Sequence, residues 1–384
     1  MPGCYPPAPI DSGVMSDRDS ALSVAHMDAD AFYVSIELRR HPELRGLPVV
    51  VAGTGPRAVV TTASYEARKF GVGSAIPASR ARRLCPGAVF LPPDFPTYRE
   101  ASAQIMGIVR EHVETVEVVG LDEAYLDLSG LFSPRAAMRR LIAEIRAETQ
   151  LTCSVGIGPN KLVAKVASDA EKPAGFVVLT REQACERFAG RPPSLIPGIG
   201  PKTTARLTAL GVSSLAQMAA LPEQVLLDTF GANLGRDLAR RARFEHDGEV
   251  AAARKVVSES RERTFDVDVH DPAELQAAMS RMAVELCESL CAHGRSGRTI
   301  GIKVRLDDFT TATRAHTLGE PTCDPAVVGA HALRLLEEYS PARPVRLLGV
   351  RVAGLAATGP AQRADEPGSC DAQGAEGGQL AMLL

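Results

Sequence analysis

Two short stretches of the sequence each carry a pair of acids beside an apolar run. In the first, Asp28 and Asp30 stand two residues apart at the end of a predicted strand, so we expect both side chains on one face. In the second, Asp122 and Glu123 are adjacent. Carboxylates at strand ends are hard oxygen ligands of the kind that a pair of Mg²⁺ ions requires for phosphoryl transfer. Taken singly, either pair could equally consist of solvated turn residues.

The segments around these acids alternate between short β-type runs and amphipathic helical runs. Apolar runs bounded by Gly, Pro or Asp predict strands at 47–52, 58–62, 117–119, 124–128, 153–157 and 176–179. Apolar residues at helical spacing predict helices at 101–113 and 136–149. The acids therefore belong to a mixed α/β domain that extends to about residue 180.

The rest of the chain divides by composition. Residues 181–250 are predicted to be helical, and a basic linker around 254–257 leads to a final α/β segment that ends near residue 354. Residues 1–20 are rich in Pro, Asp and Ser, which predicts a disordered arm. The last 29 residues lack periodicity, which predicts a flexible tail.

The composition excludes several classes of protein without choosing among the rest. With 384 residues, 45% hydrophobic and 23% charged, the chain is typical of a globular protein of two to three domains. No apolar run reaches the roughly 18 residues of a membrane span, and no signal peptide is apparent. The eight cysteines form no Cys-x-x-Cys pair, which favours reduced thiols in the cytoplasm. Lys and Arg (43) nearly balance Asp and Glu (46), so charge alone does not identify a partner.

Both acidic stretches, with their flanks, resemble the Y-family DNA polymerases, in their DinB or polymerase IV branch. The resemblance runs from about residue 24 to residue 354. Six motifs carry it, in the order that the family has: MDADAFYVSIE at 27–37, TTASYEARKFGV at 61–72, VVGLDEAYLDLSG at 118–130, CSVGIGPNKLVAKVASDAEKPAG at 153–175, PGIGPKT at 197–203 and RTIGIKVRLDDFTTATR at 298–314. Because six motifs occur in the family's order, a chance match is not a serious alternative.

The resemblance implies a multidomain α/β (α+β) fold shaped like a right hand. It implies a ferredoxin-like palm at 21–31 and 96–180, small fingers at 32–95, and a helical thumb with a helix-hairpin-helix turn at 181–250. An α/β little finger would follow at 254–355, and residues 356–384 would form the tail.

The resemblance also assigns the acids. Asp28, Asp122 and Glu123 match the catalytic carboxylates that hold two Mg²⁺ ions, and the carbonyl of Ala29 would be a further ligand. Asp30 belongs to the same motif, and we expect it to be a buried, hydrogen-bonding acid. The family often has Ser where this chain has Gly120, from which we expect a backbone effect without loss of the metal ligands.

Further residues match the family's nucleotide site. Tyr33 corresponds to the steric gate that discriminates against a 2′-hydroxyl, although a lone Tyr at a helix start is by base rate a core residue. Tyr65 and Arg68 stand three residues apart, so on a helix they converge on one face. The nucleotide-binding set that the resemblance implies consists of Phe32, Tyr33, Thr62, Tyr65, Arg68 and Lys172.

The remaining motifs imply contacts with macromolecules. Glycines before a helix allow close approach of a phosphate, and the matching DNA contacts are Gly198, Gly200, Lys202, Lys303, Arg305 and Arg314. A solvated sheet face is the alternative for the last three. The ending QLAMLL resembles a sliding-clamp-binding motif, with contacts from Gln379, Leu380, Met382, Leu383 and Leu384.

The sequence thus predicts a monomeric, cytoplasmic, nucleoid-associated translesion DNA polymerase of low fidelity. Its partners would be primer-template DNA, deoxynucleoside triphosphates and the sliding clamp, with no membrane. Three rivals remain: a catalytically silent DNA-binding repair accessory with the same fold, a palm-type nucleotidyl cyclase, and a family member that requires a multisubunit complex. The intact acids argue against the first rival, and the helix-hairpin-helix turn and the tail have no use in the second.

Overall fold

The computed structural model describes residues 22–252 and 256–357. The chain forms two compact units that divide near residue 254, with only the short segment 55–57 grouped with the second unit. The predicted arm at 1–20 and all but the first two residues of the predicted tail lie outside the described residues. No helix in the described ranges is both long and apolar enough to cross a membrane.

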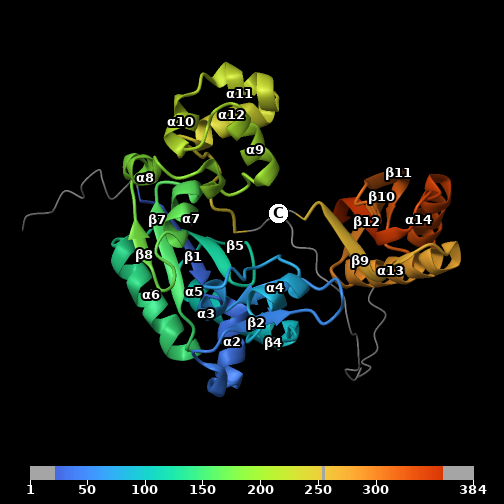
Figure 1. Cartoon of the computed structure of the whole chain (residues 1–384), viewed down its shortest axis with the longest axis horizontal. Coiled ribbons are helices and arrows are strands. Elements are labelled where there is room, and N and C mark those ends of the chain that lie inside the picture. The colour runs from blue at the N-terminus through green and yellow to red at the C-terminus, as the bar shows by residue number, and fades with distance from the viewer. Residues whose placement is uncertain (1–21, 253–255, 358–384) are drawn as a thin grey trace, which may run out of the picture. The chain divides into compact units, whose positions relative to one another are not determined.

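A five-stranded sheet forms the centre of the first unit (Figure 1). Its strand order is β5 (Val116–Val118), β6 (Glu123–Asp127), β1 (Val24–Ala29), β7 (Cys153–Gly158) and β8 (Phe176–Val178). β1 is central and antiparallel to both β6 and β7, whereas β7 and β8 are parallel. All six residues of β1 are buried, so both of its faces are covered.

The two faces of β1 differ in chemistry because alternate residues of a strand point to opposite sides. Ala25, Met27 and Ala29 belong to an apolar core with residues of α5 (Phe95–His112) and α6 (Pro134–Thr149). His26 and Asp28 point to the other side, where α7 (Lys161–Asp169) packs on β1 and β7. One face of the strand therefore holds the core together and the other carries polar groups.

The segment after β1 forms a small α/β layer. Helix α2 (Phe32–Arg40) follows a turn in which Ala31 has a φ of 45°. Strands β3 (Val60–Ala63), β2 (Val49–Ala52) and β4 (Val89–Leu91) form a three-stranded sheet with α3 (Tyr65–Arg68) and α4 (Ala78–Leu84). This layer has its own apolar cluster, which is made mainly of Val and Ala side chains.

The predicted helical segment is confirmed and is connected to the central sheet through α7. Its helices are α8 (Arg181–Phe188), α9 (Pro201–Ala209), α10 (Leu215–Ala220), α11 (Glu223–Phe230) and α12 (Ala232–Arg241), and the last four gather in one cluster (Figure 1). Leu162, Val163 and Val166 of α7 belong to the same buried cluster as Leu207, Leu226 and Leu238 of these helices. One helix thus contributes to the sheet layer and to the helical layer.

The second unit is a four-stranded antiparallel sheet with two helices. The strand order is β11 (Thr311–Thr322), β10 (Arg295–Leu306), β12 (Val345–Ala357) and β9 (Ser258–Val269). Helices α13 (Pro272–Ala292) and α14 (Pro325–Tyr339) bury apolar residues against Ile300, Ile302 and Val304 of β10. The opposite face of β10 carries Lys303 and Arg305.

Most predicted boundaries are within two residues of the observed ones, and the largest difference is at α5. The apolar spacing predicts a start at residue 101, whereas the helix begins at Phe95. Asp94 caps it, because its side chain accepts a hydrogen bond from the backbone nitrogen of Thr97, and Pro96 is compatible with a first turn. Capping chemistry, which apolar periodicity does not register, thus determines where this helix starts.

Gly156 allows α7 to lie directly on β7. A Cβ atom at this position would collide with the carbonyl oxygen of Ala164 and the backbone nitrogen of Ser168. Because both atoms belong to the backbone, neither can move aside without shifting the helix.

We therefore expect Gly156→Ala to lower the free energy of unfolding by about 1–3 kcal/mol, as overpacking does. The matched control is Gly107→Ala in α5, where a Cβ atom would meet nothing within 4 Å. That change should be neutral or stabilise by up to about 1 kcal/mol. Urea unfolding followed by circular dichroism measures both, and equal effects of the two changes would contradict the close packing.

Candidate active site

Three carboxylates, one on β1, one on β6 and one just before β6, meet at one end of the central sheet. Asp28 on β1 is directly opposite Glu123 on β6 in the antiparallel register. Asp122 precedes β6, and its carbonyl oxygen accepts a hydrogen bond of 2.8 Å from the backbone nitrogen of Ala29. The strand pairing therefore brings together acids that are about 95 positions apart in the sequence.

The burial of like charges raises the pKa of Asp122 to about 6. Desolvation is the largest cause, and the negative charges of Asp28 and Glu123 add to it. The pKa of Glu123 moves the other way, to about 2, because its Oε2 lies 3.3 Å from His26 Nε2 and because of the charge of Lys165, which together outweigh its burial. The site thus concentrates negative charge that requires positive partners.

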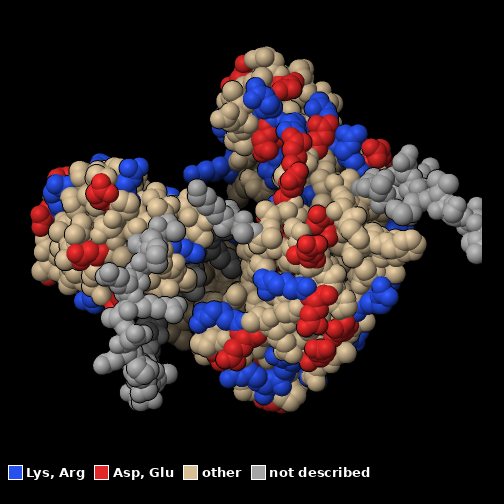
Figure 2. Space-filling model, turned by 180° about the vertical axis from the view of Figure 1, so that it is seen from behind, with Lys and Arg blue, Asp and Glu red and all other residues tan. Residues whose placement is uncertain are grey.

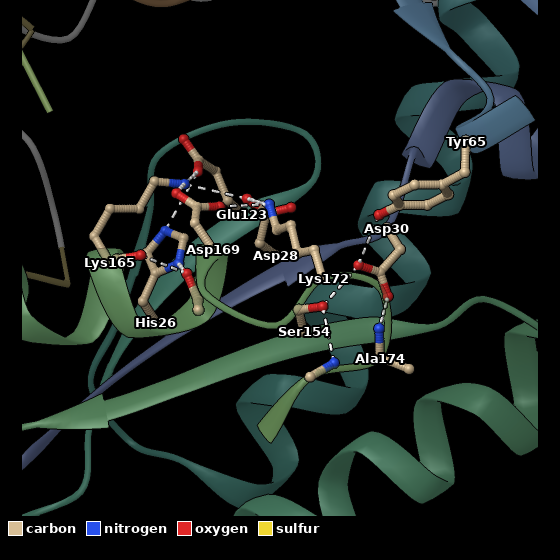
Figure 3. Close-up of polar contacts among 12 residues, drawn as sticks. His26, Asp28, Asp30, Tyr65, Glu123, Ser154, Lys165, Asp169, Lys172 and Ala174 are labelled. Atoms are coloured by element: carbon tan, nitrogen blue, oxygen red, sulfur yellow. Dashed lines mark hydrogen bonds and ion pairs between the residues drawn. The ribbon is translucent and has the colours of Figure 1, made fainter. Parts of the chain in front are cut away.

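Two lysines supply part of that positive charge (Figure 3). Lys165 Nζ lies 3.2 Å from Asp28 Oδ2 and 2.7 Å from Glu123 Oε2. Lys172 Nζ lies 2.7 Å from Asp28 Oδ2 and 2.8 Å from Asp169 Oδ1. Burial alone would lower the pKa of Lys165, but Asp28, Asp169 and Glu123 outweigh it and hold that pKa above its ordinary value.

His26 completes the buried side of the cluster. Its Nδ1 lies 2.8 Å from Ser168 Oγ, and its Nε2 lies 3.3 Å from Glu123 Oε2. This Nε2 is a buried nitrogen without a well-oriented hydrogen-bond partner among the described residues. Burial is the largest cause that lowers the pKa of His26, although the neighbouring Glu123 and Asp28 act to raise it.

The residues present fit a divalent cation. Ligand atoms of His26, Asp28 and Glu123 all lie within 4.8 Å of one another. Hard carboxylate oxygens are the donors that Mg²⁺ prefers, and the raised pKa of Asp122 shows how much the site gains from further positive charge. Ala29, whose carbonyl is an expected ligand, is the last residue of β1.

Asp30 has a separate set of partners, as expected for a buried structural acid. It is 3% exposed and accepts hydrogen bonds from Ser154 Oγ at 2.7 Å and from the backbone nitrogen of Ala174 at 2.8 Å. The Tyr65 hydroxyl lies 3.4 Å away. Although Asp28 and Asp30 are two residues apart, Asp30 joins β1 to β7, whereas Asp28 faces the lysines (Figure 3).

Tyr33 lies in an aromatic cluster beside the carboxylates. Its ring centroid is 4.7 Å from that of Tyr98 and 6.1 Å from that of Phe95, so it packs as a core residue does. Burial raises its pKa to about 12, and the charge of Asp122 contributes, which places the hydroxyl within electrostatic reach of the acids. Phe32 is 2% exposed, so its ring belongs to the core and only its backbone can face a ligand.

Tyr65 and Arg68 converge, as their spacing predicts. The Arg68 guanidinium carbon lies 4.6 Å from the centroid of the Tyr65 ring, and Arg68 Nε donates to the carbonyl of Ala63. Thr62 precedes them on β3 and is buried. The hydrogen bond from Tyr65 to Asp30 connects this pair to the end of β1.

The PGIGPKT segment forms the turn into α9. Gly198 has a φ of +84°, which disfavours other residues, and Gly200 is the N-cap residue of α9. Ile196 and Ile199 are buried and anchor the turn in the helical core. Lys202 is exposed on the first turn of the helix.

The second unit brings together only two of the three basic residues predicted there. Lys303 and Arg305 lie on the face of β10 opposite to Ile302 and Val304. Arg314 pairs in register with Ile302, so it lies on the face that the helices cover, and its guanidinium is over the Tyr339 ring. The hairpin register therefore places Arg314 on the opposite side of the sheet from Lys303 and Arg305, and its contact with DNA stays a prediction.

The predicted clamp motif at 379–384 lies outside the described residues. Three residues of the site, His26, Lys165 and Asp169, were not predicted from the sequence. The spacing of Lys165, Asp169 and Lys172 is the signal that could have found two of them. On a helix and its C-terminal extension, residues four and three apart form ion pairs on one face. Gly120 is close to the acids, since a Cβ there would lie 3.1 Å from Asp122 Oδ1.

The comparisons with known proteins agree with this geometry. A model of the impB/mucB/samB family matches residues 27–169, and the model of its C-terminal domain matches residues 256–364. The chain is 42% identical over 364 residues to DNA polymerase IV of Streptomyces coelicolor, covering 91% of this chain and 76% of that protein. It is also 42% identical to DNA polymerase IV of Methanoculleus marisnigri, covering 86% and 94% of the two chains.

Solved structures extend the similarity to the whole fold. A Y-family DNA polymerase chimera of Dbh and Dpo4 matches with a TM-score of 0.77 and 26% identity, and an insertion ternary complex of Dbh DNA polymerase matches with a TM-score of 0.62 at the same identity. Each covers 86% of this chain and 98% of the other. The chain therefore belongs to the Y-family DNA polymerases, in the impB/mucB/samB family and on its DNA polymerase IV branch.

Proposed function

We propose that this translesion polymerase extends a DNA primer by two-metal phosphoryl transfer at Asp28, Asp122 and Glu123. The observation that carries the proposal is the register of β1 and β6, which sets Asp28 opposite Glu123 and bonds Ala29 to Asp122. When bound, two Mg²⁺ ions would activate the primer 3′-hydroxyl and neutralise charge on the phosphates. Asp28, Asp122, Glu123 and the carbonyl of Ala29 would hold them.

The cationic side chains beside the acids suit the triphosphate. Lys172 contacts Asp28, and Arg68 stacks on Tyr65 at the end of β1. A guanidinium fork, an ammonium and a phenol hydroxyl offer complementary donors to phosphate oxygens, so these groups would orient the nucleotide for in-line displacement. Thr62 and the backbone of Phe32 are the remaining proposed contacts.

The layers of the fold support the assignment of four domains, and the tail is assigned from the sequence alone. Residues 21–31 and 96–180 form the palm, 32–95 the fingers, 181–250 the thumb, 254–355 the little finger, and 356–384 the tail. The fingers sheet has only three strands of three or four residues. Such a small layer encloses a new base pair loosely, which supports low fidelity, since a loose site discriminates weakly between similar substrates.

Contacts with DNA are proposed for the thumb turn and the little finger. Gly198 and Gly200 leave the backbone of the turn accessible, and Lys202 is exposed beside it. Lys303 and Arg305 share the helix-free face of β10 and would hold phosphates without reading sequence. Lys303 forms an ion pair of 2.8 Å with Glu262, which fixes its position.

Contact with a sliding clamp is proposed for the chain end. Gln379 would supply hydrogen bonds, and Leu380, Met382, Leu383 and Leu384 would fill an apolar pocket. The support is the sequence alone: a stretch of apolar residues follows a polar tail. Such a tether raises the local concentration of the polymerase at the primer end without new active-site contacts.

Replacing Asp122 by Asn should reduce single-nucleotide incorporation by about 10³-fold or more, because the change removes a charged oxygen ligand that would hold the metal ions. Binding of primer-template should stay within about twofold. The control is Asp127→Asn, at the far end of the same strand, whose side chain bonds Ser129. Retained primer extension by the Asp122 variant would refute the metal assignment. A wild type that binds DNA but extends no primer would favour the rival function, a DNA-binding repair accessory without catalytic activity.

Replacing Tyr33 by Ala should admit ribonucleotides, because removal of the ring opens space for a 2′-hydroxyl. We expect the ratio of kcat/KM for deoxy- over ribonucleotide to fall by roughly 100-fold or more, since steric exclusion is lost. Tyr33→Phe keeps the ring and should keep the ratio. If both variants discriminate between the two sugars as the wild type does, Tyr33 is a core residue and not a steric gate.

Deleting residues 379–384 should reduce synthesis only when the clamp is present. A full-length chain with these six residues in scrambled order is the matched control and should lose the same stimulation. Primer extension with and without loaded clamp measures the effect, and an equal loss in its absence would contradict a tether.

A further inference from the structure

A pocket between α7 and the thumb collects positive charge that the proposed chemistry does not use. It has a volume of about 220 Å³. The polar part of its lining comprises Tyr125, Lys161, Lys165, Arg241 and His246, and Pro197 of the helix-hairpin-helix turn closes it. No acid is part of the lining, although Lys and Arg are interspersed with Asp and Glu on the face drawn in Figure 2.

Ion pairs and a hydrogen bond with residues outside the lining hold the basic side chains of the pocket in place. Lys161 Nζ lies 2.5 Å from Glu117 Oε2, and Arg241 Nη1 lies 3.2 Å from Asp237 Oδ2. Arg241 also donates to the carbonyl of Pro197, which ties it to the glycine turn. Its Nε is a buried nitrogen without a hydrogen-bond partner in the described part of the chain. The side chains are therefore positioned before any ligand arrives.

Lys161 and Arg241 act on His246 more strongly than the acids Asp237 and Asp247 do. Burial is the largest cause that lowers the pKa of His246, and the charges of Lys161 and Arg241 lower it further. The guanidinium of Arg241, whose Nε has no partner among the described residues, and the ammonium of Lys161 line the pocket beside the His246 ring, and charged donors of this kind suit an anion with several acceptor oxygens. A phosphate has this chemistry.

The geometry of an in-line displacement indicates which nucleic-acid strand supplies the phosphate that this pocket would bind. Lys165 lines the pocket and contacts Asp28 and Glu123. Lys172 contacts the same oxygen of Asp28, and Tyr65 lies farther from the pocket, beside Asp30 (Figure 3). In an in-line displacement the attacking oxygen and the leaving pyrophosphate stand on opposite sides of the reacting phosphorus. With the triphosphate extending toward Lys172 and Tyr65, the primer must approach from the side of the pocket.

We propose that this pocket, through Lys161 and Arg241, binds one backbone phosphate of the primer strand near its 3′ end. The proposal rests on the polymerase function proposed above, since it takes the direction of the triphosphate from that function. The site would fix the primer terminus relative to the carboxylates, because Lys165 lines the pocket and also contacts Asp28 and Glu123. It would also couple the glycine turn of the thumb to the same strand.

A methylphosphonate scan tests the proposal. In each primer one of the last few linkages is a neutral methylphosphonate, and binding of the full chain to primer-template is measured by fluorescence anisotropy without a divalent cation. The wild type should lose roughly tenfold in affinity at one linkage, the loss expected for one charge-assisted contact. Arg241→Gln and Lys161→Gln should bind unmodified DNA more weakly and show no further loss at that linkage. Each should also reduce the salt dependence by about one phosphate contact.

Controls separate the pocket from general effects. Arg139→Gln removes an exposed guanidinium that stacks on Phe176, away from the pocket, and should keep the linkage-specific loss of the wild type. Arg241→Lys should restore part of the affinity. Because Arg241 supports the turn at Pro197, the Lys161 variant provides a test that does not depend on that support.

The outcomes are distinct. An unchanged linkage-specific loss in both Gln variants would overturn the proposal. A raised KM for nucleotide or weaker pyrophosphate inhibition, with no effect of any linkage, would assign the pocket to the nucleotide and overturn it as well. A wild type that binds but never extends primers contradicts the proposed function, whereas extension without linkage coupling contradicts this inference alone.

Discussion

The crowding of one buried and two half-buried carboxylates around one point is the constraint on which the structure depends. Like charges at close range repel each other, and desolvation penalises each of them, as the raised pKa of Asp122 shows. Lys165 and Lys172 offset part of that cost by direct contact with Asp28, and a bound cation would offset the rest. The acids remain together because β1 and β6 are held by backbone hydrogen bonds and by an apolar core that does not involve them.

This division of labour follows from the twofold period of a strand. Met27 anchors β1 in the core with α5 and α6, while its neighbours His26 and Asp28 face α7. We therefore expect a substitution at Met27 to change mainly the free energy of unfolding, and a substitution at Asp28 to change mainly the activity. Asp30, just beyond the strand, pins β1 to β7 through Ser154, so the position of Asp28 is determined from both directions.

The sequence alone predicted the layers, the helical segment and the acids, because those depend on local periodicity and on motifs with fixed spacing. It could not predict that Arg314 lies on the helix-covered face, since the register of a hairpin is a pairing property. It also missed His26, whose role arises only when β1 lies beside β6 and α7. Partners that meet through tertiary packing leave no local pattern.

Helix α7 belongs to two layers at once, and this has a mechanical consequence. Leu162 and Val166 are packed among residues of α9, α11 and α12, while Lys165, between them in sequence, reaches Asp28 and Glu123. A rotation of these helices that preserves their packing on α7 must carry the ammonium group of Lys165 with it. Helix α7 thus couples the packing of the helical cluster to the positive charge beside Asp28 and Glu123, so a change that displaces one displaces the other.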